Sequence, residues 1–176
     1  TLAEDQGEKA VGIVLSGTGS DGRRGVRAIE EHGGMVMVQD EQTARFDGMP
    51  RSAISTGLAD FVIPPDEMPS RLIEYFTHPY VAGDKSTGAI LNNEDLLLRV
   101  FALIRERHRV DFTYYKMTTV VRRIERRMSI TRTADLPEYI SYLESNPKEI
   151  TLLYRELLIG VTNFFRDAEA FKELED

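Results

Sequence analysis

The chain has 176 residues, of which 41% are hydrophobic and 29% charged, a composition typical of a globular protein of one domain or two small ones. Its net charge of −7 argues against a general nucleic-acid binder, and the absence of cysteine excludes disulfides and thiolate metal sites, so neither nucleic acid nor metal is expected as a partner. No hydrophobic run is long enough to cross a bilayer, which argues against direct membrane insertion. Because the chain starts at Thr1 without Met and ends in acidic residues within a helical pattern, we expect a fragment of a longer protein.

The first half of the sequence alternates strand and helix patterns. Apolar runs at residues 11–15, 35–38 and 58–63 predict strands, and residues 25–31, 50–56 and 69–76 predict helices. Strands that alternate with helices pair in parallel through right-handed crossovers. Residues 1–77 are therefore predicted to form an α/β domain with a partial doubly wound parallel sheet, to which upstream strands would add.

The second half reads as helical. Residues 78–93 lack periodicity and predict a linker, after which helices are expected at residues 94–107, 119–131, 136–145 and 147–159. Asn93, Thr119 and Asp135 are the residues expected to cap the first three helices. Residues 94–161 therefore predict a small all-α domain.

The first strand runs into the glycine-rich sequence SGTGSDG, residues 16–22. One hypothesis is a dinucleotide cradle, since the strand, the helix and Asp40 at the end of the next strand fit that fingerprint. Against it, the carboxylate of Asp21 would face the pyrophosphate. A second hypothesis is that Asp21 only caps the following helix, and a third is that Asp21 takes part in chemistry.

The third hypothesis comes from a resemblance. SGTGSDGRRGVRAIEEHGG and VQDEQTARFDGMPRSAISTGLADFVIPPDEMP closely resemble the C-terminal part of the chemotaxis receptor methylesterase domain. This resemblance implies that Asp21 is the acid of a Ser-His-Asp triad, in which a buried carboxylate orients the imidazole and stabilises the imidazolium. In that family the serine and the histidine precede this segment, and His32, His78 and His108 are expected to be structural or solvent-exposed rather than catalytic. The fragment is therefore not expected to hydrolyse esters alone.

A basic stretch stands out in the second half. Residues 116–132 hold six basic residues against one acid, a net charge of +5, whereas residues 1–80 hold 7 basic and 13 acidic residues, a net charge of −6. On a helix, Val120, Val121, Ile124 and Met128 share one side. The opposite side is expected to carry an exposed arginine face, which consists of Arg122, Arg123, Arg126 and Arg127. This face is either simply solvated or a docking surface for carboxylates, which arginine grips in pairs.

A second resemblance bears on this face. LLLRVFALIRERHRVDFTYYKMTTVVRRIERRM and PEYISYLESNPKEITLLYRELLIGVTNFFRD resemble the N-terminal helical domain of the chemotaxis receptor methyltransferase. The resemblance implies that the arginine face docks the acidic methylation helices of a chemoreceptor. It also implies that residues 162–176 connect to a following S-adenosylmethionine domain, with Thr162 and Arg166 as contacts to that cofactor. No S-adenosylmethionine is expected to bind the fragment itself.

Together the two resemblances imply a cytoplasmic, bifunctional chemotaxis enzyme that removes and installs methyl groups on receptor glutamates. The fragment would span the join and be inactive by itself. An alternative is a non-catalytic binding module that docks an acidic helix through residues 122–127. A nicotinamide-dependent oxidoreductase is the third possibility.

Overall fold

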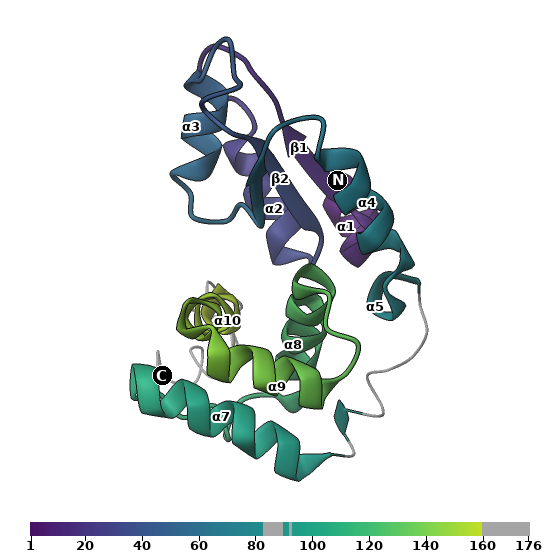
Figure 1. Ribbon diagram of the computed structural model, residues 1–176, viewed down its shortest axis with the longest axis vertical. Coiled ribbons are helices and arrows are strands. Elements are labelled where there is room, and N and C mark those ends of the chain that lie inside the picture. The colour runs from purple at the N-terminus through teal and green to yellow at the C-terminus, as the bar shows by residue number, and fades with distance from the viewer. Residues whose placement is uncertain (83–89, 92, 160–176) are drawn as a thin grey trace, which may run out of the picture.

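A computed structural model describes residues 1–82, 90–91 and 93–159. The described residues form an α/β unit (residues 1–82) and a helical unit (residues 90–159), which lie one above the other in Figure 1. The fold class predicted from the sequence, a partial parallel α/β sheet followed by an all-α region, is confirmed. None of the helices in these ranges has the length and hydrophobicity needed to span a membrane.

The α/β unit follows the predicted alternation of strands and helices. Its elements are α1 (Leu2–Gln6), η1 (Gly7–Lys9, a 3-10 turn), β1 (Val11–Val14), α2 (Arg23–Glu31), β2 (Met35–Gln39), α3 (Gly48–Ile54), β3 (Phe61–Ile63), α4 (Met68–Thr77) and α5 (Pro79–Ala82). The first helix was not predicted, although Thr1 and Glu4 form a capping box at its start. Strand β3 is three residues shorter than the predicted run 58–63.

The sheet is parallel throughout, with strand order β1-β2-β3. Val11 lies opposite Met35, and Met37 lies opposite Phe61. Because β2 is the central strand and is covered on both faces, all five of its residues are buried. The uninterrupted apolar run of β2 is what such a position requires.

Each face of the sheet is covered by different helices. Val36 and Val38 of β2 pack with Val26 of α2 and Ala53 of α3 on one face. Met35 and Met37 point to the other face, where they pack with Met68 and Tyr75 of α4 and with Val81 of α5. Figure 1 shows β2 between α2 and α3 on one side and α1 and α4 on the other.

The turn from α2 to β2 depends on its two glycines. Gly33 has a φ of 86°, which ends α2 at the point that the sequence predicts. A Cβ on Gly34 would collide with the carbonyl of Ala10 and with Ile29. The close approach of the chain here leaves the carbonyl of Gly34 at the edge of the α/β unit.

Four helices make up most of the helical unit. They are α7 (Glu94–His108), α8 (Met117–Thr131), α9 (Leu136–Ser145) and α10 (Pro147–Ile159). Their shared core includes Ile104, Ile124, Tyr139, Leu143 and Leu153. The Oδ1 of Asp135 accepts a hydrogen bond from the backbone N–H of Glu138 at 2.9 Å, so this predicted cap is confirmed.

One predicted cap is wrong. Helix α8 starts at Met117, two residues before the position expected from Thr119, and its N-cap residue is Lys116, whose side chain makes no capping hydrogen bond. A lysine side chain carries no acceptor that could mark the start of a helix in the sequence. The first turn of α8 therefore gave no recognisable signal.

The segment between the two units is partly packed. Residues Pro79–Ala82 form α5, and Val81 is buried in the core of the α/β unit. Ile90, at the other end of the predicted linker, is buried in the core of the helical unit. The described ends of this segment therefore belong to the two units that it joins.

Candidate functional site

Asp21 lies in the loop that follows β1, at the carboxyl end of the sheet. In open α/β sheets this edge is where functional groups are presented. Asp21 is exposed, and Gly22 with a φ of 94° is the N-cap residue of α2, with no side-chain capping bond. The hypothesis that Asp21 only caps this helix is therefore wrong, and its carboxylate is available to another group.

The glycine loop (residues 16–22) is held by a second loop that sequence reasoning did not connect with it. The backbone N–H of Gly17 donates to the carbonyl of Phe46, and the N–H of Met49 donates to the carbonyl of Gly17, both at 2.9 Å. The Oγ of Ser16 accepts from the N–H of Phe46 at 2.9 Å. These bonds fix the loop that carries Asp21 to the clamp segment (residues 46–49).

Gly48 is the residue that lets the clamp segment approach so closely. A Cβ at this position would lie 3.0 Å from the backbone nitrogen of Gly19 and 3.1 Å from its carbonyl oxygen. The sequence FDGM, residues 46–49, therefore needs glycine for close backbone contact. Gly48 was the one feature of the sequence that indicated a close contact between the clamp segment and the glycine loop.

The three histidines of the chain contact other groups than Asp21. His32 Nδ1 lies 2.8 Å from the carbonyl of Ala28, and His78 Nε2 lies 3.2 Å from that of Thr133. The His108 ring stacks on Tyr154 with 4.1 Å between ring centroids. Within the described part of the chain, Asp21 thus has no imidazole partner, and a complete triad is not formed here.

The dinucleotide hypothesis gains no support from Asp40. Its Oδ1 accepts from the backbone N–H of Thr43 at 2.8 Å, and its Oδ2 accepts from the Thr43 hydroxyl at 2.9 Å. These bonds form a local turn after β2. The carboxylate that would bind a ribose is thus engaged in shaping a loop.

The arginine face of α8 contradicts its predicted exposure. The exposed fractions of the side chains of Arg122, Arg123, Arg126 and Arg127 are 54%, 10%, 1% and 6%. Only Arg122 is open to solvent, because the α/β unit and α10 cover the other three. Segments far away in the sequence provide this cover, which helix periodicity alone could not reveal.

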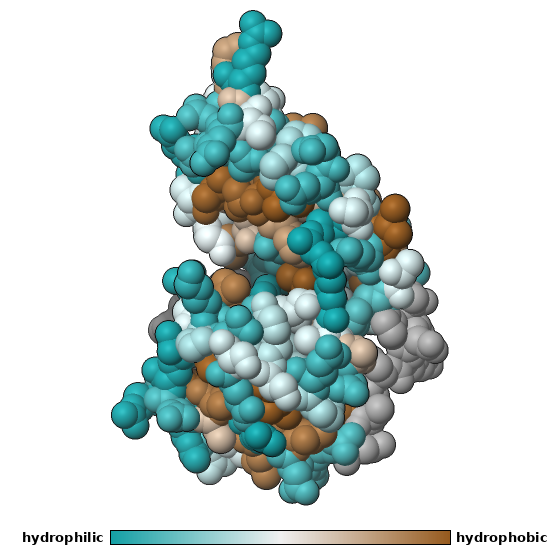
Figure 2. Space-filling model, in the orientation of Figure 1, coloured by the Kyte–Doolittle hydropathy of each residue, from teal (hydrophilic) through white to brown (hydrophobic). Residues whose placement is uncertain are grey.

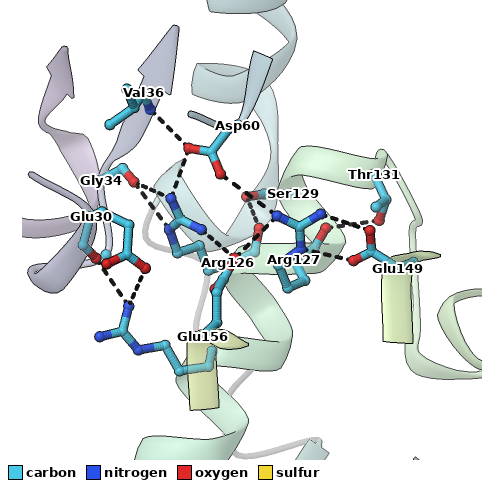
Figure 3. Close-up of polar contacts among 12 residues, drawn as sticks. Glu30, Gly34, Val36, Asp60, Arg126, Arg127, Ser129, Thr131, Glu149 and Glu156 are labelled. Atoms are coloured by element: carbon cyan, nitrogen blue, oxygen red, sulfur yellow. Dashed lines mark hydrogen bonds and ion pairs between the residues drawn. The ribbon is translucent and has the colours of Figure 1, made fainter. Parts of the chain in front are cut away.

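Arg126 is the centre of the contact between the two units (Figure 3). Its Nη2 donates to the Gly34 carbonyl at 2.7 Å and to Asp60 Oδ2 at 2.8 Å, and its Nη1 donates to Glu156 Oε1 at 2.5 Å. Asp60 Oδ2 also accepts the N–H of Val36 in β2, at 2.8 Å. A single guanidinium therefore joins the residues that directly precede β2 and β3 to helix α10.

Arg127 is bound mainly within the helical unit. Its Nε and Nη2 each donate to Glu149 at 2.7 Å, and its Nη1 donates to Glu156 at 3.1 Å (Figure 3). The hydroxyl of Tyr139 donates to the same Glu149 at 3.0 Å. This paired geometry is the strong form of an arginine–carboxylate contact.

Burial shifts the pKa values of this network. Burial raises the pKa of Glu30 to about 7, against the opposing effect of Arg126 and Arg123, while Glu156 and Asp60 add to the rise. Burial also raises the pKa of Asp60. For Arg126, burial alone would lower the pKa, but Asp60, Glu156 and Glu30 hold it above its ordinary value. Arg126 is therefore charged at every ordinary pH, whereas Glu30 titrates near neutrality.

We predict that stability falls as pH rises from about 4.5 to about 7 because Glu30 holds a proton in the folded chain longer than in the unfolded chain. The loss across this window is on the order of 3 kcal/mol, and Asp60 acts in the same direction. Glu30→Gln removes the titrating group and should flatten the dependence. Urea unfolding between pH 4.5 and 7.5 measures it.

Glu31→Gln is the matched control, since it makes the same change on an exposed neighbour. Its pH dependence should equal that of the unmodified chain. If the free energy of unfolding depended on pH equally in Glu30→Gln and Glu31→Gln, the assignment of this dependence to Glu30 would be contradicted.

Thr162 and Arg166, the predicted contacts to S-adenosylmethionine, lie outside the described residues. Their role stays a prediction. In the ranges that the structure does describe, no group of three or more His, Asp or Glu side chains could hold a metal ion.

Comparisons with known proteins divide the chain at the same place. A family model described as CheB methylesterase matches residues 1–72, and one described as CheR methyltransferase, all-alpha domain, matches residues 95–158. The "Uncharacterized 104.1 kDa protein in hypE 3'region" of Rhodobacter capsulatus is 38% identical, over 100% of this chain and 21% of that protein.

Two further similar proteins cover less than half of this chain. A protein-glutamate methylesterase/protein-glutamine glutaminase of Moorella thermoacetica is 44% identical over 44% of this chain and 18% of that protein. The crystal structure of the Thermotoga maritima CheB methylesterase catalytic domain is 39% identical, covering 41% of this chain and 38% of that chain, with a TM-score of 0.40. The chain spans about a fifth of the length of the curated relatives named here. Residues 1–72 are therefore similar to the CheB methylesterase family, and residues 95–158 are similar to the all-alpha domain of the CheR methyltransferase family.

Proposed function

We propose that this chain is the junction of a cytoplasmic, bifunctional chemotaxis enzyme that both hydrolyses glutamyl methyl esters and methylates glutamates on chemoreceptors. The observation that carries the proposal is the succession of a methylesterase match and a methyltransferase match in one chain. The Rhodobacter capsulatus relative, which aligns with the whole chain, supports the same succession in a second protein.

In the esterase reaction, Asp21 is the orienting acid. A histidine supplied from upstream sequence donates its Nδ1–H to the Asp21 carboxylate and takes the proton of a serine as that serine attacks the ester carbonyl. The negative carboxylate stabilises the imidazolium, which then gives its proton to the departing methanol. Water hydrolyses the acyl-enzyme by the same route in reverse.

The placement of Asp21 supports this role. Its loop is exposed at the carboxyl edge of the sheet and fixed by the clamp segment. Strand β1 is an outer strand, and Ile13 and Leu15 at its end are 43% and 48% exposed. Further strands of a larger methylesterase domain could add at this edge and bring the serine and the histidine to Asp21.

The methyltransferase part of the proposal assigns the helical unit to receptor docking. Acidic methylation helices of a chemoreceptor would bind the arginine face of α8, with Arg122 already open to solvent. S-adenosylmethionine would supply the methyl group in a following domain, with Thr162 and Arg166 as proposed contacts. The 176-residue chain itself is proposed to be inactive in both reactions.

The test compares this chain with a longer protein that contains it together with upstream and downstream sequence. The longer protein should release methanol from a methylated receptor fragment and transfer labelled methyl groups from S-adenosylmethionine to an unmethylated one. The 176-residue chain should do neither. If the longer protein lacks both activities but binds the receptor fragment, the chain is a binding module instead.

A further inference from the structure

The C-terminal end of helix α2, in the α/β unit, contacts the arginine face of α8. Arg123 donates to the carbonyls of Glu30 and Glu31, both at 3.0 Å, and Arg122 donates to the carbonyl of His32 at 3.3 Å. The last carbonyls of a helix have no partner within it and form the negative end of its macrodipole. The arginine face therefore binds the end of α2 much as it would bind an anionic group.

The four arginines divide into two sets by their partners. Arg122, Arg123 and Arg126 donate to groups of the α/β unit, whereas the short hydrogen bonds of Arg127 go to Glu149 and Glu156 of α10. Separation of the units would thus free Arg122, Arg123 and part of Arg126. Arg127 would stay paired inside the helical unit.

In the packed arrangement the face cannot serve a second acidic partner. Nη2 of Arg126 donates to both Gly34 and Asp60, and the side chain is 1% exposed. The side chain of Arg123 is 10% exposed. A helix that presents several carboxylates needs several guanidinium groups, but only Arg122 is accessible.

The contact between the units is polar and incompletely satisfied. Both carboxylate oxygens of Glu30 and Oε2 of Glu156 are buried without a hydrogen-bond donor in the described part of the chain. A cleft of about 330 Å³, lined by groups that include Leu58, Asp60 and Arg155, opens between the units, and Figure 2 shows a notch at this level. Polar contacts of this kind within a chain usually permit movement of the units relative to each other.

Helix α8 would keep its shape if the units separated. Val120, Val121 and Ile124 on its other side are buried in the core of the helical unit. The arginine face would then be presented on a rigid helix, ready for another occupant.

We propose that the arginine face is a shared surface for which the end of α2 and an acidic partner helix compete, so that packing of the methylesterase-like unit restrains docking to the methyltransferase-like unit. This inference rests on the docking role in the proposed function. When only a small fraction of molecules is open, the apparent affinity for a partner falls by that fraction. Release of the contact should therefore strengthen docking.

The experiment opens the contact from the α/β side without changing any arginine. Glu30→Lys places a positive charge against Arg123 and Arg126. The probe is a helical peptide of about 20 residues with glutamates at i, i+4 spacing. Binding is measured by fluorescence anisotropy and opening by the radius of gyration in X-ray scattering, both on the 176-residue chain. Glu30→Lys should raise the radius of gyration and lower the Kd about tenfold or more.

Two further variants serve as a charge control and as a milder way to open the contact. Glu31→Lys makes the same charge change on the exposed neighbouring side chain, so it should bind like the unmodified chain apart from a small electrostatic gain. Asp60→Asn removes one charge from the contact but keeps an oxygen for the Val36 N–H, and it should open the contact more mildly if Glu30→Lys fails to fold.

The outcomes separate the two claims. If the unmodified chain and a variant with a larger radius of gyration bind the peptide with equal affinity, the proposed competition is overturned but docking is not. No binding by a chain that scattering shows to be open overturns docking itself. An unchanged radius of gyration in both folded variants overturns the holding role of Glu30 and Asp60.

Discussion

Replacement of Asp21 by Asn should lower the turnover of methyl ester hydrolysis by on the order of 10⁴-fold in a longer protein that contains this chain. The neutral amide cannot stabilise an imidazolium, and its N–H₂ group favours the wrong imidazole tautomer. Because Asp21 is exposed and caps no helix, folding should be almost unaffected, with a change below about 0.5 kcal/mol. Methanol release from a methylated receptor fragment measures turnover.

Asp66→Asn is the matched control, in the loop after the end of β3. It removes the same charge from an exposed side chain that lies outside the glycine loop and the clamp segment. Its turnover should stay close to that of the unmodified protein. Equal turnover for the unmodified protein and Asp21→Asn would remove Asp21 from the reaction, and a KM effect alone would assign it to substrate binding.

Replacement of Arg126 by Met should destabilise the chain by about 3–5 kcal/mol because it leaves Asp60 and Glu156 as buried charges without their main partner. The same change at Arg122 should cost less than about 1 kcal/mol, because its pair with Glu8 is largely exposed. The free energy of unfolding in urea at neutral pH measures both.

Arg126→Lys adds a second comparison. Lysine keeps the charge but cannot donate at the same time to Gly34, Asp60 and Glu156 in the planar geometry that arginine has. The loss of stability in Arg126→Lys should lie between the losses in Arg126→Met and Arg122→Met. Similar, small losses at positions 122 and 126 would contradict the view that the buried contact holds the units together.

Sequence reasoning predicted the elements whose signals are local. The predicted apolar run 35–38 lies in the buried central strand β2, the glycines after Glu31 end α2, and Asp135 caps α9. The bounds of α9 and α10 agree with those expected. These features depend on residues within a few positions of each other, so the sequence displays them directly.

The environment of the arginine face could not be predicted in the same way. Helix periodicity correctly placed Val120 and Ile124 in the core, but it assigned the opposite side to solvent. The groups that cover Arg126 come from Gly34 and Asp60, 92 and 66 positions earlier in the chain. Only the contrast between the net charge of −6 on residues 1–80 and the net charge of +5 on residues 116–132 indicated that the acidic first half would face the basic helix.

The glycine loop (residues 16–22) also combines a local signal with a long-range contact. The glycine loop and its carboxylate were evident as a motif, whereas the bracing by Phe46 and Met49 depends on two loops meeting at the end of the sheet. Gly48 marked this meeting, but close backbone contact is only one of several reasons for a glycine. The structure was needed to connect the two.

The central claim is that the arginines of α8 hold the two units together as one body. Because the chain has no cysteine, spin labels can be placed uniquely at the exposed positions of Ser55→Cys in the α/β unit and Ser141→Cys in the helical unit. Double electron–electron resonance on this doubly labelled chain should give a single narrow distance distribution that broadens when Arg126→Met is added. A distribution that is already broad with Arg126 in place would contradict the claim.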